Sequence, residues 1–274
     1  MKSAGDWLAR LMRANWKRAV LGIAALALFV FVWYMVSGWL QARDPVQGSL
    51  VPPPDKVASK FLWLLTHKDR VTQLYLLQHM FTSLERVFLG FVLALALALP
   101  SGLVMGRSWK AESFGRPVVE IFRPIPPLAW APAFLILFKV FWGPVAVVFL
   151  GAFFPILFNV MLGARSVDRI LIDAAKTLGA GRSDIFTRVV LPYTIPYLMT
   201  GITVGLGIGW MCIVAAEFVA AEGGGLGYFI QASADFGYYP EMYSGMALIG
   251  MISVLTTGVA GFFEGEVYRR MGLK

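Results

Sequence analysis

Few side chains in this sequence could perform chemistry, and they do not form a catalytic pattern. The chain has one cysteine, Cys212, and two histidines, His67 and His79. Neither a disulfide framework nor a Cys/His metal site is therefore expected. The sequence also lacks a Gly-x-x-x-x-Gly-Lys-Ser/Thr stretch that could cradle nucleotide phosphates. We expect no catalytic residue, no metal and no cofactor bound by this chain.

The composition predicts a membrane protein. Of the 274 residues, 58% are hydrophobic and only 15% are charged, which leaves too little polar surface for a water-soluble globule of this size. A lipid bilayer is the expected surrounding. The net charge of +8 does not indicate nucleic acid, because no Lys/Arg run of that kind occurs. In a membrane protein, the positions of Lys and Arg indicate above all which connections between the spans face the cytoplasm.

One carboxylate, Glu217, lies well inside an apolar stretch. Acids within a membrane are costly, so a function or a pairing is the default interpretation. Glu217 could form a gate on a transport pathway, or it could pair with Arg86 or with a neighbouring subunit. A negative charge is a poor contact for an anionic substrate, so gating or helix fastening is favoured.

Apolar segments predict an all-α integral membrane protein with six transmembrane helices. The first span covers residues 19–40, about 22 residues, enough to cross a hydrocarbon core of about 30 Å. Residues 1–18 before it form either a basic amphipathic helix on the membrane surface or a poorly ordered positive flank. An extracytoplasmic connector at 41–82, with short helices at 56–66 and 71–80, leads to a core at 83–265 with the other five spans and a tail at 266–274. The core spans are predicted at 83–105, 125–140, 144–163, 196–219 and 243–263.

Charge placement predicts the orientation. Six spans put both termini on one side, and most Lys and Arg residues lie before the first span, between the second and third, after the fourth and in the tail. This face is cytoplasmic by the positive-inside rule. Arg123 counts here as part of the cytoplasmic connection between the second and third spans. Arg86 and Lys139 lie only near span ends, so we expect no fixed cationic pocket within the spans.

Prolines break the start of the third span. Pro124, Pro126, Pro127 and Pro132 fall within nine residues, and this stretch cannot be regular helix. Irregular backbone at membrane depth is tolerated only where protein or a water-filled cavity covers it. Pro126, Pro127 and Trp130 are therefore candidate pathway or gate residues. A kink that only packs the bundle is the alternative.

A glycine stripe in the fifth span has two interpretations as well. Gly201, Gly205, Gly207 and Gly209 lie beside Trp210. Trp210 is a candidate pathway residue, but small residues at this spacing favour close helix packing. Further along, residues 222–231 predict a glycine-rich turn followed by a short helix or a re-entrant segment.

A polar loop at 166–192 separates the fourth and fifth spans. Apolar residues at mostly helical spacing predict a short amphipathic helix that ends at Gly179, followed by a second helix. A small-residue face beside a glycine break would let another protein approach closely. An ordinary helical hairpin is the alternative. The residues that form the pattern are Asp173, Ala174, Ala175, Gly179, Val189, Leu191 and Pro192.

This pattern resembles the Glu-Ala-Ala coupling loop in the membrane subunits of bacterial ABC importers, with Asp for Glu and Val for Ile. Five further segments, at 52–54, 83–86, 122–132, 205–210 and 215–227, resemble the nitrate, taurine, aliphatic sulfonate and bicarbonate branch of these permeases. The resemblance implies a type I importer permease fold in a multi-pass bacterial inner-membrane protein. It also implies the coupling residues Asp173, Ala174, Ala175, Leu178, Gly179, Ala180, Arg182, Leu191 and Pro192.

The same resemblance implies partners: a second copy of the chain, two ATPase subunits that bind ATP and Mg, and an extracytoplasmic substrate-binding protein. We expect a homodimeric permease that moves a small anion such as nitrate, a sulfonate such as taurine, or bicarbonate, and not an enzyme. A secondary, ion-coupled transporter is the first alternative, favoured only by Glu217 and the proline-broken segment. An integral membrane enzyme would need a convergent set of acids, histidines or metal ligands at one interface.

Overall fold

The computed structural model describes residues 4–220 and 223–272. Glu222 of the predicted glycine turn and the last two residues of the predicted tail lie outside this range. Residues 1–18 were predicted to be amphipathic, but nearly all of their side chains lie outside the described part. The described residues are nearly all helical. In chain order the elements are α1 (Ala4–Arg43), α2 (Pro45–Leu50), α3 (Pro54–Thr66), α4 (Leu76–Arg107), α5 (Trp109–Phe122), the 3₁₀ turn η1 (Pro127–Trp130), α6 (Ala131–Arg165), α7 (Arg169–Thr177), α8 (Arg182–Ile185), the π-helical turn η2 (Phe186–Val190), α9 (Leu191–Val219), α10 (Leu226–Asp235) and α11 (Tyr239–Arg270).

Local sequence explains several helix ends. The Asp44 side chain accepts hydrogen bonds from the amides of Val46 and Gln47 at the start of α2, and Asp168 caps α7 through the amide of Ile170 at 2.9 Å. Such caps satisfy amides that have no partner inside the helix. Gly179, with φ of +82°, follows α7, as the predicted glycine stop requires. The helix predicted at 71–80 is wrong, because residues 68–75 form a turn and α4 starts at Leu76.

Five described helical stretches are long and apolar enough to cross a membrane, where the sequence predicted six spans. They cover 20–43, 76–107, 127–165, 182–219 and 239–270. The predicted third and fourth spans, 125–140 and 144–163, fall almost entirely within the single stretch 127–165. This stretch is not one straight helix, because it is broken sharply at Lys139, whose φ of 63° and ψ of −177° are not helical.

The chain folds back on itself at this break. A Cβ atom added to Gly143 would lie 3.0 Å from the Cα of Leu135, whereas eight residues along a straight helix rise by about 12 Å. After the break, α6 runs parallel to α4: the Arg86 guanidinium reaches the carbonyl of Val140, and the Gly102 backbone contacts Leu157. Because α4 and this part of α6 run in the same direction, the chain between them must cross back along the bundle. Residues 109–138 form this connection.

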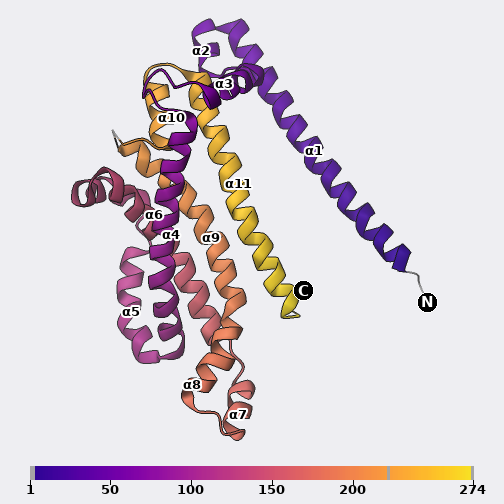
Figure 1. The fold of residues 1–274 in the computed structure, drawn as a ribbon, viewed down its shortest axis with the longest axis vertical. Coiled ribbons are helices and arrows are strands. Elements are labelled where there is room, and N and C mark those ends of the chain that lie inside the picture. Colours follow the sequence, from indigo (N-terminus) through magenta and orange to yellow (C-terminus); the bar gives the residue numbers. More distant parts are fainter. Residues whose placement is uncertain (1–3, 221–222, 273–274) are drawn as a thin grey trace.

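The return path begins with α5, which the sequence had placed in a connection between spans. Figure 1 shows α5 beside the lower half of α4. An ion pair between Glu112 and Arg165 and a contact between Arg123 and Phe158 hold it against the end of α6. The predicted third span at 125–140 is therefore wrongly bounded, and Arg123 does not lie in a free connection.

Helices α4, α6 and α9 form the centre of the bundle, and glycines allow their close approach. Gly90 and Gly102 on α4 lie against α6. On α9, Gly201 and Gly205 lie against Ile156 and its neighbours. An added Cβ atom would collide with α6 at Gly90 and Gly102, and at Gly201 and Gly205 it would lie only 3.1 and 3.3 Å from α6. This close approach favours the packing interpretation of the glycine stripe at Gly201 and Gly205. Gly207 has no neighbour within 4 Å and does not share that role.

The long axis of the molecule has two distinct ends (Figure 1). At the α10 end, α2, α3 and α10 lie across the tips of the long helices, and at the α7 end, α7 and α8 protrude. The C-terminal end of α11 and the N-terminal end of α1 point toward the α7 end. Helix α1 stands apart from the bundle and exposes most of its apolar side chains, as a lipid-facing helix would.

Candidate functional sites at the two ends of the bundle

Glu217 of α9 lies at the α10 end and pairs with Arg86 of α4. An Arg86 Nη1 atom donates to Glu217 Oε1 at 2.8 Å, and both side chains are almost completely buried. The Ser83 hydroxyl and the Gly227 amide donate to the same carboxylate at 2.8 and 2.9 Å. The carboxylate is thus bound by three partners, which a buried charge needs to offset its loss of water. The Arg86–Glu217 pairing proposed from sequence is present in the structure.

The glycine turn after α9 completes this network. Arg86 Nη1 also donates to the carbonyl of Gly224 at 2.9 Å, and Arg86 Nη2 donates to the carbonyl of Gly223 at 3.0 Å. Arg86 Nε is buried and has no hydrogen-bond partner among the described residues. Gly225 has φ of +112°, and a Cβ atom there would lie 2.3 Å from a Glu217 oxygen. Only glycine fits both requirements. The turn therefore folds over the ion pair and joins α4, α9 and α10.

A second buried cluster supports the turn from the connector side. The Gly225 amide donates to His79 Nδ1 at 3.2 Å, so that nitrogen accepts and the ring hydrogen lies on Nε2. His79 Nε2 faces Asp69 and Thr72. Burial alone would raise the pKa of Asp69, but hydrogen bonds from His79, from Thr72 and from the backbone of Val71 lower this pKa to about 2. The connector and the glycine turn thus form one polar unit.

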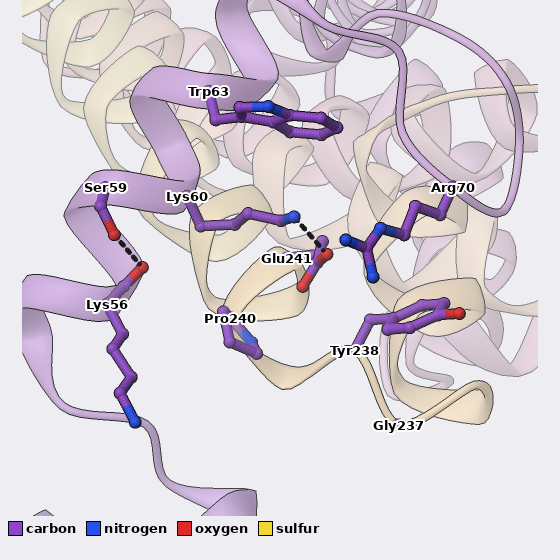
Figure 2. Close-up of a pocket in the computed structure, with 9 residues that line it drawn as sticks. All are labelled: Lys56, Ser59, Lys60, Trp63, Arg70, Gly237, Tyr238, Pro240 and Glu241. Atoms are coloured by element: carbon purple, nitrogen blue, oxygen red, sulfur yellow. Dashed lines mark hydrogen bonds and ion pairs between the residues drawn. The ribbon is translucent and has the colours of Figure 1, made fainter.

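A shallow depression lies on the surface at the same end, between α3 and the start of α11 (Figure 2). Its volume is about 590 Å³. Lys60 pairs with Glu241 at 2.8 Å and lies 4.2 Å from the centre of the Trp63 ring. The Arg70 guanidinium points toward Glu241, with the Tyr238 ring beside it. The charged residues of the lining are Lys56, Lys60, Arg70 and Glu241, so positive charge is in excess.

The proline-broken segment follows α5, as an irregular stretch that the sequence predicted. Pro126 precedes the 3₁₀ turn and Pro127 is its first residue. Trp130 stacks between Phe122 and Phe134, with ring centres 5.6 and 5.8 Å away. Its indole nitrogen is buried and has no hydrogen-bond partner among the described residues. Such a donor is complementary to an acceptor brought from elsewhere.

Trp210 has a different environment from Trp130. It is buried in the core, and its indole nitrogen donates to Thr256 of α11 at 2.8 Å. The side chain therefore fastens α9 to α11. This contact favours the packing interpretation that the sequence left open.

The α7 end carries the predicted loop, which forms α7, a glycine turn and α8. Asp173 pairs with Lys176 three residues away at 2.9 Å, and both side chains are exposed. Leu178 is 88% exposed and Ile170 is 73% exposed. Leu191 and Pro192 begin α9 directly after the π-helical turn, so the loop continues into that helix. Two short helices were predicted here, and both are present.

Sequence reasoning missed most partners of the Glu217 network. Ser83 and His79 come from one face of α4, four residues apart, and Asp69 comes from the turn before it. Polar residues at helical spacing inside an otherwise apolar segment were the available signal. Among the described residues, no group of three or more His, Cys, Asp or Glu side chains could hold a metal ion.

A helical bundle with several helices long and apolar enough to cross a membrane is the architecture of a multi-pass membrane protein. Comparison with known sequences makes the class specific. Residues 76–272 match the family of binding-protein-dependent transport system inner membrane components. The chain belongs to this family, and it is a multi-pass inner-membrane permease subunit of an ABC transporter.

Individual relatives agree. The chain is 33% identical to the taurine transport system permease protein of Escherichia coli (strain K12) over 90% of this chain and 89% of that protein. It is 27% identical to a nitrate import permease protein of Leptolyngbya laminosa over 97% of this chain and 94% of that protein. The methionine ABC transporter MetNI, solved in an inward-facing conformation, superposes with a TM-score of 0.63 at 20% identity over 76% of this chain and 98% of that chain. The predicted type I importer fold and the predicted branch are confirmed.

Proposed function

We propose that this chain is the permease subunit of an ATP-driven importer for a small anion, that two copies form the translocation pathway, and that a separate ATPase supplies the energy. The observation that carries the proposal is the exposed loop at the α7 end. Ile172 of the loop packs into the core, but Ile170 and Leu178 remain exposed, and a second protein would cover them. Relatives that carry taurine and nitrate in their names support a small oxyanion as cargo.

In this proposal the α7 end faces the cytoplasm, where ATP is available. Asp173, Ala174, Ala175, Leu178, Gly179, Ala180 and Arg182 contact the ATPase. Leu191 and Pro192 pass its movement into α9, because α9 starts where the loop ends. The termini lie on the same side, in accord with the positive-inside rule.

The α10 end then faces outward and receives the binding protein. The depression with Lys56, Lys60 and Arg70 supports this assignment, because an excess of positive charge suits acidic groups on a docking surface. Pro126, Pro127 and Trp130 line the pathway. Glu217 fastens the outward ends of α4 and α9 and does not contact the anion.

Reconstitution tests the proposal. The permease, its ATPase and its binding protein are placed in proteoliposomes, and uptake of labelled taurine and of nitrate is measured with and without ATP. We expect uptake that needs all three proteins and is blocked by vanadate. Uptake by the permease alone, driven by a proton or sodium gradient, would instead establish the secondary transporter.

A further inference from the structure

Helix α5 has a charged face and an apolar face. Glu112, Arg116 and Glu120 follow at intervals of four residues on the charged face, and Arg123 comes three residues later. Between them, Phe114 is 85% exposed on the other side. An exposed Phe suits lipid contact. The ion pair between Glu112 and Arg165 and the contact of Arg123 with Phe158 place α5 beside the last part of α6, which belongs to the candidate spanning stretch 127–165, although no residue of α5 itself is buried (Figure 1).

Among the described residues, two of the three arginines at the charged face form ion pairs and one does not. Arg165 of α6 pairs with Glu112. Arg116 lies 2.8 Å from Glu120 and 3.6 Å from Glu112. Arg123 has no carboxylate partner among the described residues, and its guanidinium lies 4.6 Å from the centre of the Phe158 ring. A charged side chain at this depth needs a partner or a functional reason.

A small cavity lies where Arg123 is placed. It has a volume of about 110 Å³ and is lined by Arg116, Arg123, Arg165 and Phe158, with Glu112 and Glu120 at its edge. Three arginines and two glutamates give one positive charge in excess. The proline-broken segment follows Arg123 directly. Within it, Trp130 stacks on Phe122, the residue before Arg123, and its indole nitrogen has no hydrogen-bond partner among the described residues. The Arg123 guanidinium and the Trp130 indole are thus both donors without an acceptor among the described residues.

We propose that this cavity is an oxyanion-binding station on the translocation pathway, with Arg123 as its principal ligand. The inference rests on the proposed import function and adds a place where the permease itself contacts its cargo. A planar guanidinium binds the oxygens of nitrate or of a sulfonate through paired hydrogen bonds. The two glutamates hold Arg116 and Arg165, which limits the positive charge of the station. Binding is then strong enough for an anion to enter and weak enough for it to leave.

The proposal departs from the expectation of no fixed cationic pocket in the spans. That expectation assigned Arg123 to a connection outside the membrane. The phosphate of an anionic lipid has the same chemistry as the proposed cargo and is the competing source of the oxyanion. The experiment therefore has to separate a transported anion from a headgroup.

The test compares Arg123→Gln with Arg123→Lys and with a control, Arg107→Gln, at an exposed arginine at the end of α4. All are assembled with the ATPase and binding protein in vesicles of phosphatidylcholine alone and of phosphatidylcholine with phosphatidylglycerol. We expect Arg123→Gln to lower taurine or nitrate uptake about tenfold or more, as loss of a charged hydrogen bond implies. Arg123→Lys should keep part of the uptake, and Arg107→Gln should be close to wild type. Assembly is checked by size-exclusion chromatography.

A charge-restoration arm keeps the test decisive if Arg123→Gln assembles poorly. The natural cysteine, Cys212, is buried, so Arg123→Cys can be modified selectively. A cationic aminoethyl thiosulfonate should restore uptake, whereas an anionic sulfonatoethyl reagent should not. The proposal is overturned by unchanged uptake in Arg123→Gln, by equal recovery with both reagents, or by a defect that appears only with phosphatidylglycerol. Absence of ATP-dependent uptake by the wild type would refute the import function instead.

Discussion

The two ends of this bundle differ in the burial and the bonding of their charged residues. At the α10 end, Arg86 and Glu217 are buried and bonded to groups from α4, α9 and the glycine turn. At the α7 end, Asp173 and Lys176 are exposed and bond only to each other within one helix. The Arg86–Glu217 network at the α10 end is therefore complete within a single chain. The α7 end has a structured surface whose apolar groups remain uncovered, which is what a docking surface requires.

The difference predicts separate consequences for mutations. Changes at the α10 end should act on stability, because they leave buried groups without partners. Changes at the α7 end should act on coupling, because few internal contacts depend on the exposed side chains. Four predictions test this separation, in order of their expected effect on stability.

Removal of the buried carboxylate should have the largest effect. Glu217→Ala leaves the Arg86 guanidinium buried without its counter-charge, and breaking a buried pair in this way costs about 3–5 kcal/mol. Thermal unfolding in detergent measures the loss. Glu85→Gln is the control, because Glu85 is exposed and adjacent to Arg86 in the sequence. Equal stability of Glu217→Ala and the control would show that the pair does not hold the α10 end together.

The glycine turn should be the next most sensitive feature. Gly225→Ala places a side chain at φ of +112° and within 2.3 Å of a Glu217 oxygen. The backbone conformation alone costs about 1–3 kcal/mol, and displacement of the carboxylate adds to this. Gly237→Ala is the matched control, since Gly237 has φ of +73° but no neighbour within 4 Å. We expect a clearly lower unfolding temperature for Gly225→Ala, and identical values would contradict the proposed contact.

The sequence predicted this arrangement only in part. The apolar segments and the Asp173 pattern follow from local composition and spacing, so the helical membrane fold and the two loop helices could be predicted. The path of α5 could not, because a helix with Glu112, Arg116 and Glu120 is polar enough to suggest a connection. Its placement depends on Arg165 and Phe158, more than thirty residues later in the chain. The break at Lys139 also has no strong local signal, since a positive φ at lysine is uncommon.

Acid should weaken the α10 end through Asp69. Its pKa is lowered from 3.8 to about 2, so its contribution to stability is complete above about pH 4 and disappears as the pH falls toward 2. Asp69→Asn lacks this dependence. The difference in unfolding temperature between the wild type and Asp69→Asn should be constant from pH 7 to pH 5 and should shrink between about pH 4 and pH 2. Asp235→Asn, at an exposed aspartate, should show no such change.

The smallest effect on stability is expected at the α7 end. A substitution there should act on coupling to the ATPase and not on folding. Leu178 is 88% exposed, so Leu178→Ala should change the free energy of unfolding by no more than about 0.5 kcal/mol. If the ATPase covers this side chain, the same substitution should sharply reduce both ATP-dependent uptake and binding of the ATPase to the permease. Leu255→Ala, at an exposed leucine of α11, provides a control of the same chemistry on a different surface. Loss of coupling without loss of stability would separate the two ends as proposed, whereas full uptake by Leu178→Ala would remove this residue from the contact with the ATPase.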